Sequence, residues 1–272
     1  MFRRQDGTDQ CMGDPVPHRE ISFVLNLHLP SSNMASIATT LQFLTVPAVK
    51  KHTATVIFVH GLGDTGYGWQ PVAGMFSKET SLGHVKWVLP HSPQSPVTAN
   101  MCMVMPSWFD IKSFGFKDVE DEAGMLKSKA SLTELIDAEL AAGIPSNRII
   151  LGGFSQGAAM SLLTGLSFEK QLAGIVCLSG WVPIKDTLHK MLAPYAKRLP
   201  IFWGHGSNDP LVQPRLAEES VEFLKSIGIL DAKPNELAGL SYNVYPGVGH
   251  STNMQELEDL KGWIAKVIPE QS

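Results

Sequence analysis

The stretch Ile149–Leu163 reads IILGGFSQGAAMSLL. Its apolar beginning leads into Gly153-Phe154-Ser155-Gln156-Gly157, after which small and apolar residues follow at helical spacing. This order predicts a strand, a sharp turn and a helix. Glycines on both sides of a serine allow the tight turn that exposes its hydroxyl at the tip of the strand. We therefore expect Ser155 to be a nucleophile; the alternative is a serine in an ordinary loop.

The composition indicates a folded protein with a sizeable core. The chain has 272 residues, of which 44% are hydrophobic and 18% charged, and this fits one α/β domain. A formal net charge of −4 argues against an extended basic surface, so we expect no nucleic-acid partner. No apolar run has the length needed to cross a bilayer.

The three cysteines, Cys11, Cys102 and Cys177, indicate a reducing compartment. They are far apart and odd in number, which fits neither a disulfide framework nor a structural zinc site. We expect a soluble protein of the cytoplasm, with the nucleus as a second compartment.

Residues 1–33 differ from the rest of the chain. Polar residues, glycines and prolines interrupt them, and the one apolar patch, Ile21–Leu29, is too broken for a secretion signal. We expect a flexible extension at 1–33 and the folded domain at 34–272, with Met34 as an alternative start.

Strand and helix patterns alternate along that domain. Strands are expected at Leu41–Val46, Ala54–Val59, Val85–Leu89, Ile149–Leu151, Leu172–Leu178, Ile201–Trp203 and Ser241–Tyr245. Helices are expected at Trp69–Lys78, Asp118–Ala142, after Ser155, and at Ile184–Lys197, Arg215–Ile227 and Met254–Ile268. This alternation predicts a mainly parallel central sheet with helices on both faces.

One stretch of the domain, Val97–Phe116, lacks a regular period although it is rich in methionine and aromatic residues. Two interpretations are open. It forms either a loop folded over an apolar ligand or a small satellite core.

The carboxyl ends of parallel strands form the rim where ligands bind. A serine hydroxyl needs a base, and the base needs a group that fixes its tautomer. His250 and Asp209 each follow a predicted strand, and the order Ser, Asp, His suits such a sheet. The alternative for Asp209, which precedes a proline, is a turn-forming residue. We expect His60 and His205, on the same rim, to brace loops by hydrogen bonds.

An oxyanion formed at Ser155 needs fixed donors, and backbone N–H groups serve well. We expect them from Gln156, the residue after the nucleophile, and from Leu62, in a glycine-rich loop after an early strand. The alternative for Leu62 is a plain core leucine. The sequence shows no metal-ligand cluster and no nucleotide-binding motif, so we expect neither a metal nor a cofactor.

Several longer motifs then carry a family resemblance over roughly residue 40 to the C-terminus. They are His60–Gly66, Pro106–Asp110, Glu120–Gly124, Gly152–Gly157, Leu178–Pro183 and Tyr245–His250. In this order they resemble the cytosolic acyl-protein thioesterases, also called lysophospholipase-like carboxylesterases, which are single-domain α/β-hydrolases.

The resemblance implies specific site residues. They are a triad of Ser155, Asp209 and His250, an oxyanion hole from Leu62 and Gln156, and an acyl channel lined by the Pro96–Trp108 loop, including Met105 and Trp108, and by Trp181.

The resemblance also implies an activity, the hydrolysis of palmitoyl thioesters on protein cysteines through an acyl-enzyme. S-acylated proteins would be the substrates, with lysophospholipids and small esters as side substrates. Membrane contact would be transient at most, and the protein a monomer or weak homodimer. A general carboxylesterase for small oxoesters and a catalytically silent protein that binds acylated partners are the rival interpretations.

Two features depart from the family pattern. Residues 1–33 have no counterpart, and no cysteine follows Met1 or Met34, which argues against recruitment to membranes by N-terminal lipidation. Gly228–Leu240 is longer than usual, and we expect this length to alter the rim.

Overall fold

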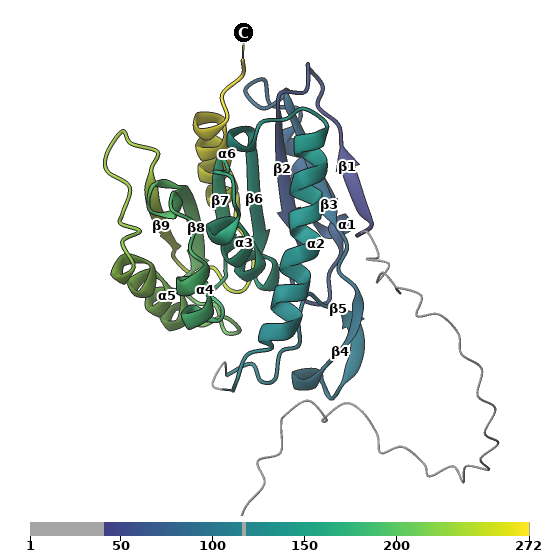
Figure 1. Ribbon diagram of the computed structural model, residues 1–272, viewed down its shortest axis with the longest axis vertical. Helices are drawn as coiled ribbons and strands as arrows, with labels where there is room; N and C mark the ends of the chain where they lie inside the picture. The colour runs from purple at the N-terminus through teal and green to yellow at the C-terminus, as the bar shows by residue number, and fades with distance from the viewer. Residues whose placement is uncertain (1–40, 116–117, 272) are drawn as a thin grey trace, which may run out of the picture. The chain divides into compact units, whose positions relative to one another are not determined.

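The computed structural model of the protein describes residues 41–115 and 118–271. Their main feature is a seven-stranded sheet with the strand order β1-β3-β2-β6-β7-β8-β9 and helices on both faces (Figure 1). The extension predicted at 1–33, the patch Ile21–Leu29 and Met34 lie outside the described residues. The division at residue 34 therefore stays a prediction.

The elements follow the predicted alternation. The strands are β1 (Phe43–Val46), β2 (Ala54–Val59), β3 (Val85–Pro90), β4 (Gln94–Val97), β5 (Met103–Pro106), β6 (Ile149–Phe154), β7 (Gly174–Leu178), β8 (Pro200–Gly206) and β9 (Gly239–Tyr245). The α-helices are α1 (Gly66–Phe76), α2 (Glu122–Ala141), α3 (Gln156–Ser167), α4 (Lys185–Met191), α5 (Pro214–Ser226) and α6 (Met254–Val267). In the seven-stranded sheet only β1, which pairs with β3, runs antiparallel to its neighbour. The prediction of a mainly parallel α/β sheet is confirmed.

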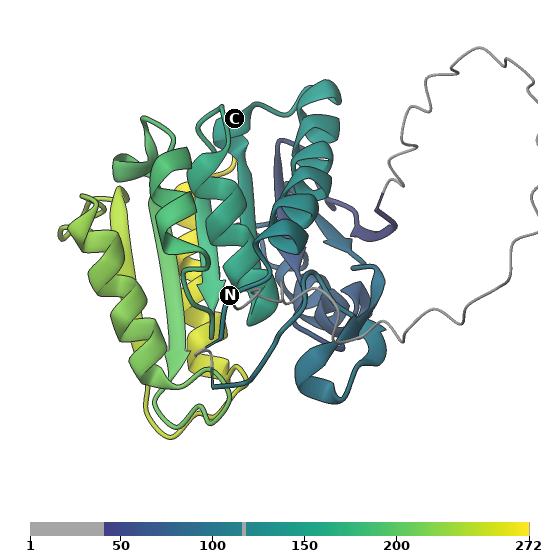
Figure 2. The ribbon, with the colours of Figure 1, turned by 60° about the horizontal axis from the view of Figure 1, so that its bottom comes forward.

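Two apolar cores lie on the two faces of this sheet. Phe76 of α1 and Leu260 of α6 belong to the core on one face, and residues such as Leu132 of α2 and Leu162 of α3 belong to the core on the other. Figure 2 shows α6, in yellow, behind the sheet and the green helices in front of it. Because both faces are covered, a central strand such as β2 is buried along its whole length and is apolar at nearly every position.

The stretch Val97–Phe116 contains regular structure that the sequence did not predict. β4 and β5 form a two-stranded antiparallel hairpin. The sequence did not indicate these strands because they contain Pro96 and Pro106, and proline is rare inside a sheet. The connection contains no glycine, and Met101 and Cys102 take the positive φ values, 54° and 56°, that glycine or asparagine usually adopts.

The apolar side chains of this stretch divide between the core and the surface, and the interpretation as a loop over an apolar ligand stays a prediction. Trp108, Phe109 and Ile111 are buried in the main core on the α2 and α3 face, not in a separate satellite core. Met101 is 85% exposed and Met103 52%, so the tip of the hairpin contributes nothing to that core.

Helix α4 is shorter than predicted. The sequence pattern indicates a helix over Ile184–Lys197, but α4 ends at Met191 and a separate 3₁₀ turn forms at Ala196–Arg198. Pro194 explains the interruption, because proline lacks a backbone donor and disfavours a helical residue before it.

The long stretch Gly228–Leu240 lies at the amino ends of the strands, opposite the rim. It leads into the amino end of β9, where Gly239 N donates to Leu199 O over 3.3 Å beside the start of β8. The rim is formed by the carboxyl ends of the strands. The expectation that this stretch alters the rim is therefore wrong.

The structure bears on two further expectations. Cys177 is free and buried in β7, whereas Cys102 is disulfide-bonded, which departs from the expectation of unpaired cysteines. None of the helices in the described ranges combines the length and the hydropathy needed to span a bilayer. The cytoplasmic and nuclear location stays a prediction.

Candidate active site

Ser155 occupies the sharp turn between β6 and α3. Its backbone angles, φ 55° and ψ −118°, are strained for a residue with a side chain. The flanking glycines make the turn possible, since a Cβ on Gly157 would lie 2.1 Å from Val59 O and one on Gly153 2.5 Å from the carbonyl carbon of Gly157. Ser155 N donates to Leu178 O over 2.8 Å and ties the turn to β7. The serine is thus held in place by its backbone.

A chain of hydrogen bonds runs from Ser155 through His250 to Asp209. Ser155 Oγ lies 2.9 Å from His250 Nε2, and His250 Nδ1 lies 2.7 Å from Asp209 Oδ2. The other carboxylate oxygen, Asp209 Oδ1, accepts from Leu211 N over 2.9 Å and from Val212 N over 3.0 Å. These two bonds aim Oδ2 at His250. With its proton on Nδ1, the imidazole can accept a proton from the serine at Nε2.

His60 and His205 brace loops, as predicted. His60 Nδ1 lies 2.7 Å from Gly61 O, and its Nε2 accepts from Ser92 N over 3.0 Å. His205 Nε2 donates to Val212 O over 2.8 Å. Burial lowers the pKa of both imidazoles and favours their neutral form.

The two predicted oxyanion donors also lie on the rim. Gln156 is the first residue of α3, so its N–H has no acceptor within the helix. Leu62 is half-buried in the loop after β2, and Gly63 N fixes this loop by donating to Pro106 O over 2.8 Å. Within residues 41–115 and 118–271, neither the Leu62 N–H nor the Gln156 N–H donates to another protein group. Both remain available for an oxyanion.

The side chain of Gln156 has a role that the sequence did not reveal. It is completely buried, its Oε1 accepts from Trp108 N over 2.9 Å, and its Nε2 donates to Phe109 O over 2.7 Å. The residue after the serine therefore fixes the main chain at 108–109. A polar residue among the small and apolar residues of α3 is the only sequence signal for this role.

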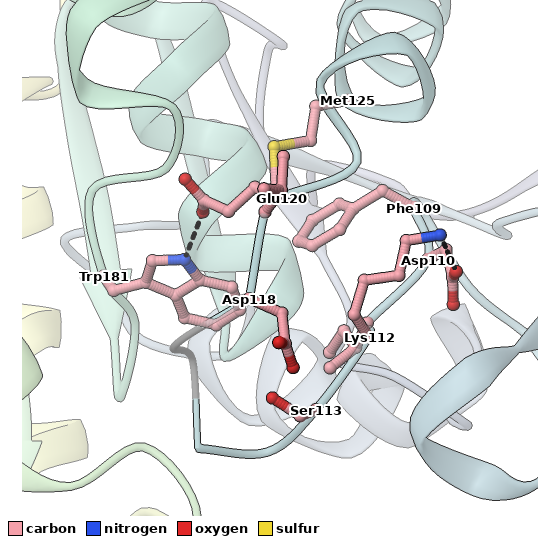
Figure 3. A pocket seen from close by; sticks show the side chains of 10 residues that line it. Phe109, Asp110, Lys112, Ser113, Asp118, Glu120, Met125 and Trp181 are labelled. Atoms are coloured by element: carbon pink, nitrogen blue, oxygen red, sulfur yellow. Dashed lines mark hydrogen bonds and ion pairs between the residues drawn. The ribbon is translucent and has the colours of Figure 1, made fainter. Parts of the chain in front are cut away.

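The three residues predicted to line an acyl channel lie in different settings. Met105 is half-buried on β5, whereas Trp181, which follows β7, is only 5% exposed and has its ring 6.1 Å from that of Phe109. Figure 3 shows Trp181 and Phe109 beside a small hollow. Trp108 is only 2% exposed, and its indole N–H donates to His60 O over 2.9 Å. It therefore lies beneath the rim and supports the His60 loop.

The part of the chain that the structure describes contains no group of three His, Cys, Asp or Glu side chains able to hold a metal ion. The serine, the imidazole and the carboxylate lie together at this rim, beside the backbone donors.

The parallel sheet and the serine at its strained turn are those of a hydrolase of the α/β-hydrolase class. The chain belongs to the Phospholipase/Carboxylesterase family, whose model matches residues 42–268.

Relatives and solved structures agree with this assignment. An acyl-protein thioesterase 1 of Cryptococcus neoformans var. neoformans serotype D is 47% identical over 241 residues, which cover 85% of this chain and 99% of that protein. An acyl-protein thioesterase 1 of Neurospora crassa is 40% identical over 243 residues, 87% of this chain and 95% of that protein. The crystal structure of acyl-protein thioesterase 2 of Zea mays has a TM-score of 0.71 at 27% identity and covers 84% of this chain and 99% of that one. That of Arabidopsis thaliana SOBER1 has a TM-score of 0.72 at 33% identity, with coverage of 79% and 99%.

Proposed function

We propose that the protein is an acyl-protein thioesterase that removes long-chain acyl groups, such as palmitoyl, from protein cysteines. The observation that carries its chemistry is the hydrogen-bond chain Asp209–His250–Ser155 on the rim. The substrate class is supported by relatives that are 40–47% identical and are named acyl-protein thioesterase 1.

The first half of the proposed reaction forms an acyl-enzyme. Ser155 Oγ attacks the thioester carbonyl carbon while its proton passes to His250 Nε2. The carbonyl oxygen becomes an oxyanion and accepts hydrogen bonds from the N–H groups of Leu62 and Gln156. The buried carboxylate of Asp209 stabilises the imidazolium. When the carbon–sulfur bond breaks, the cysteine thiol leaves with the proton from His250.

The second half releases the fatty acid. Water takes the place of the thiol, His250 Nε2 removes its proton, and the oxygen attacks the acyl carbon. The second tetrahedral intermediate uses the same two donors. Collapse expels Ser155 Oγ, which regains its proton from His250. No cofactor takes part in this proposal.

Recognition of the alkyl chain is the second part of the proposal. We assign it to Trp181 and Met105, an aromatic and a flexible side chain that suit an irregular apolar guest. Trp108 lies beneath this surface and supports it through the hydrogen bond that its indole N–H donates to His60 O. Lysophospholipids are proposed as side substrates. Transient membrane contact and a monomeric or weakly dimeric state stay predictions.

A general carboxylesterase for small oxoesters is the second candidate function. It is favoured by the family description, Phospholipase/Carboxylesterase, which covers more than thioesters. The two candidates differ in leaving group and chain length, so kinetics separate them.

The test has two stages. A fluorophosphonate probe should label the wild-type protein and leave Ser155→Ala unlabelled, and an unlabelled wild type would favour the silent-binder alternative. Then kcat/KM is compared for peptides that carry the same acyl group as a thioester or as an oxoester. The acyl groups run from acetyl to palmitoyl, and each substrate is used at concentrations at which it is monomeric. The proposal expects the palmitoyl thioester to be the best substrate. An optimum at short oxoesters would establish the carboxylesterase instead.

A further inference from the structure

The carboxylate of Glu120, just before α2, ties its own segment to the distant segment between β7 and α4. Its Oε1 accepts from Trp181 Nε1 over 3.2 Å, and its Oε2 accepts from Ile184 N over 2.7 Å. Figure 3 shows the first of these bonds beside the small hollow. Burial raises the pKa of this carboxyl, so the site is an unfavourable one for a charge. The hydrogen bonds from Trp181 Nε1 and Ile184 N offset the cost of burying this carboxylate.

The turn that Glu120 holds is strained. Ile184, at the start of α4, has φ 34° and ψ 55°, a left-handed conformation that a β-branched residue seldom adopts. Its N–H is bound by Glu120, and Val182 N donates to Ser220 Oγ of α5 over 3.0 Å. Side chains from two other segments thus impose the conformation that places Trp181.

Contacts also connect Trp181 to the nucleophile turn. Gly180 packs closely on α3, since a Cβ there would lie 2.6 Å from Ala158 Cβ. The ring of Trp181 meets that of Phe109 in a T-shaped contact at 6.1 Å, and Phe109 O accepts from Gln156 Nε2. Trp181 therefore contacts Phe109 on one side and Glu120 on the other, and Phe109 links it to Gln156, the residue after Ser155.

Glu120 and Trp181 lie between two hollows. A slot with a volume of about 20 Å³ is lined by Phe109 and Met125, among others, and a wider hollow of about 560 Å³ is lined by Val182 and Ser220. Both hollows are also lined by Glu120 and Trp181. Together with Asp118 and Val119, which also line both hollows, these two side chains form the wall between them.

We propose that Glu120 is a positioning residue that fixes the Trp181 indole as a wall of the acyl-binding surface and thereby sets the acyl-chain length that the enzyme prefers. This inference rests on the proposed function. An alkyl chain gains roughly fourfold in affinity for each methylene it buries against a fixed apolar surface. The slot of about 20 Å³ is too small for an indole, so a Trp181 ring without its acceptor can move only toward the wider hollow, and the distal methylenes then lose their contact. The carbonyl chemistry at Ser155 does not depend on that contact.

The test compares Glu120→Gln and Glu120→Ala with the wild type on acyl thioesters from butyryl to palmitoyl. A glutamine keeps the volume but has one acceptor oxygen, and its amide nitrogen would face the second N–H donor. We expect kcat/KM for the palmitoyl thioester to fall about tenfold in Glu120→Gln, through KM, with kcat and butyryl turnover within about twofold. Glu134→Gln is the matched control, because Glu134 is exposed on α2 and lines neither hollow. It should keep the wild-type profile.

A double-mutant cycle with Trp181→Phe isolates the pair. The phenyl ring keeps an apolar wall but has no N–H, so Glu120→Gln should cost less at palmitoyl in this background than in the wild type. Equal losses at every chain length with a lower melting temperature, or an unchanged profile, would overturn the inference. A wild-type enzyme without a long-chain preference would instead overturn the proposed function, and the inference with it.

Discussion

Asp209 and His250 meet across the rim with very different exposure. The Asp209 side chain is 0% exposed and that of His250 15%, and 2.7 Å separates Oδ2 from Nδ1. A buried carboxylate is stable only when it is well bonded, and the N–H groups of Leu211 and Val212 satisfy its other oxygen. Because Oδ1 is satisfied by these two N–H groups, Oδ2 orients the imidazole of His250.

Asp209→Asn should lower kcat by about 10⁴ with little effect on KM, because an amide can donate to Nδ1 and favour the wrong tautomer of His250. Steady-state kinetics on a palmitoyl thioester measure the effect. Asp186→Asn, an exposed carboxylate on α4, is the control and should behave as the wild type. If Asp209→Asn is mild, the third member of the triad is another residue.

Ser155→Ala should lower kcat by about 10⁴ or more and leave the fold intact, since it removes the nucleophile and little volume. Thermal unfolding of the variant should match the wild type. Activity within tenfold of the wild type would rule out the proposed acyl-enzyme.

The sequence predicted the parts of the site that rest on local pattern. Glycines around Ser155 and the change from strand to helix period mark the turn, and the order of the loops placed Asp209 and His250 on the same rim. The contacts of Gln156 with the main chain at 108–109 and of Glu120 with Trp181 could not be predicted in this way. Each joins residues 47 to 61 positions apart, and no spacing encodes such pairs.

The fold was predictable where periodicity is strong and less so where local rules are broken. β2 has the bounds that its apolar run predicts. The hairpin of β4 and β5 was missed because Pro96 lies within a strand and Met101 adopts a left-handed conformation. Tertiary contacts stabilise both exceptions, and the sequence does not display those contacts.

Gly157→Ala should destabilise the protein by about 1–3 kcal/mol or more, because the added methyl group would meet Val59 O at 2.1 Å and backbone cannot move aside easily. Gly74→Ala is a matched control within α1, where an added Cβ meets nothing within 4 Å. It should stabilise the protein by about 0.5–1 kcal/mol through helix propensity. Denaturant unfolding measures both; a neutral Gly157→Ala would contradict the close packing of the turn.

The last prediction concerns Glu256, in the first turn of α6, which is completely buried. Neither carboxyl oxygen has a hydrogen-bond partner among the described residues, and Oε1 would lie 2.2 Å from a Cβ on Gly204. Burial raises the pKa of Glu256 from 4.5 to about 7. The folded state therefore holds a proton that the unfolded state releases at lower pH. The stability contributed by the protonated carboxyl is fully present below pH 4.5 and is lost as the pH rises through about 7.

Glu256→Gln cannot ionise and should lack this dependence. Between about pH 4 and pH 8, its free energy of unfolding should rise relative to that of the wild type by on the order of 3 kcal/mol. Denaturant unfolding at several pH values measures the difference. Glu258→Gln is the control on the same helix, since Glu258 is exposed and binds Lys261, and its free energy of unfolding should change with pH as that of the wild type does. If the free energies of unfolding of Glu256→Gln and the wild type change with pH in parallel, Glu256 is ionised in the folded protein. A carboxylate that is charged in the folded state causes no loss of stability over this pH range.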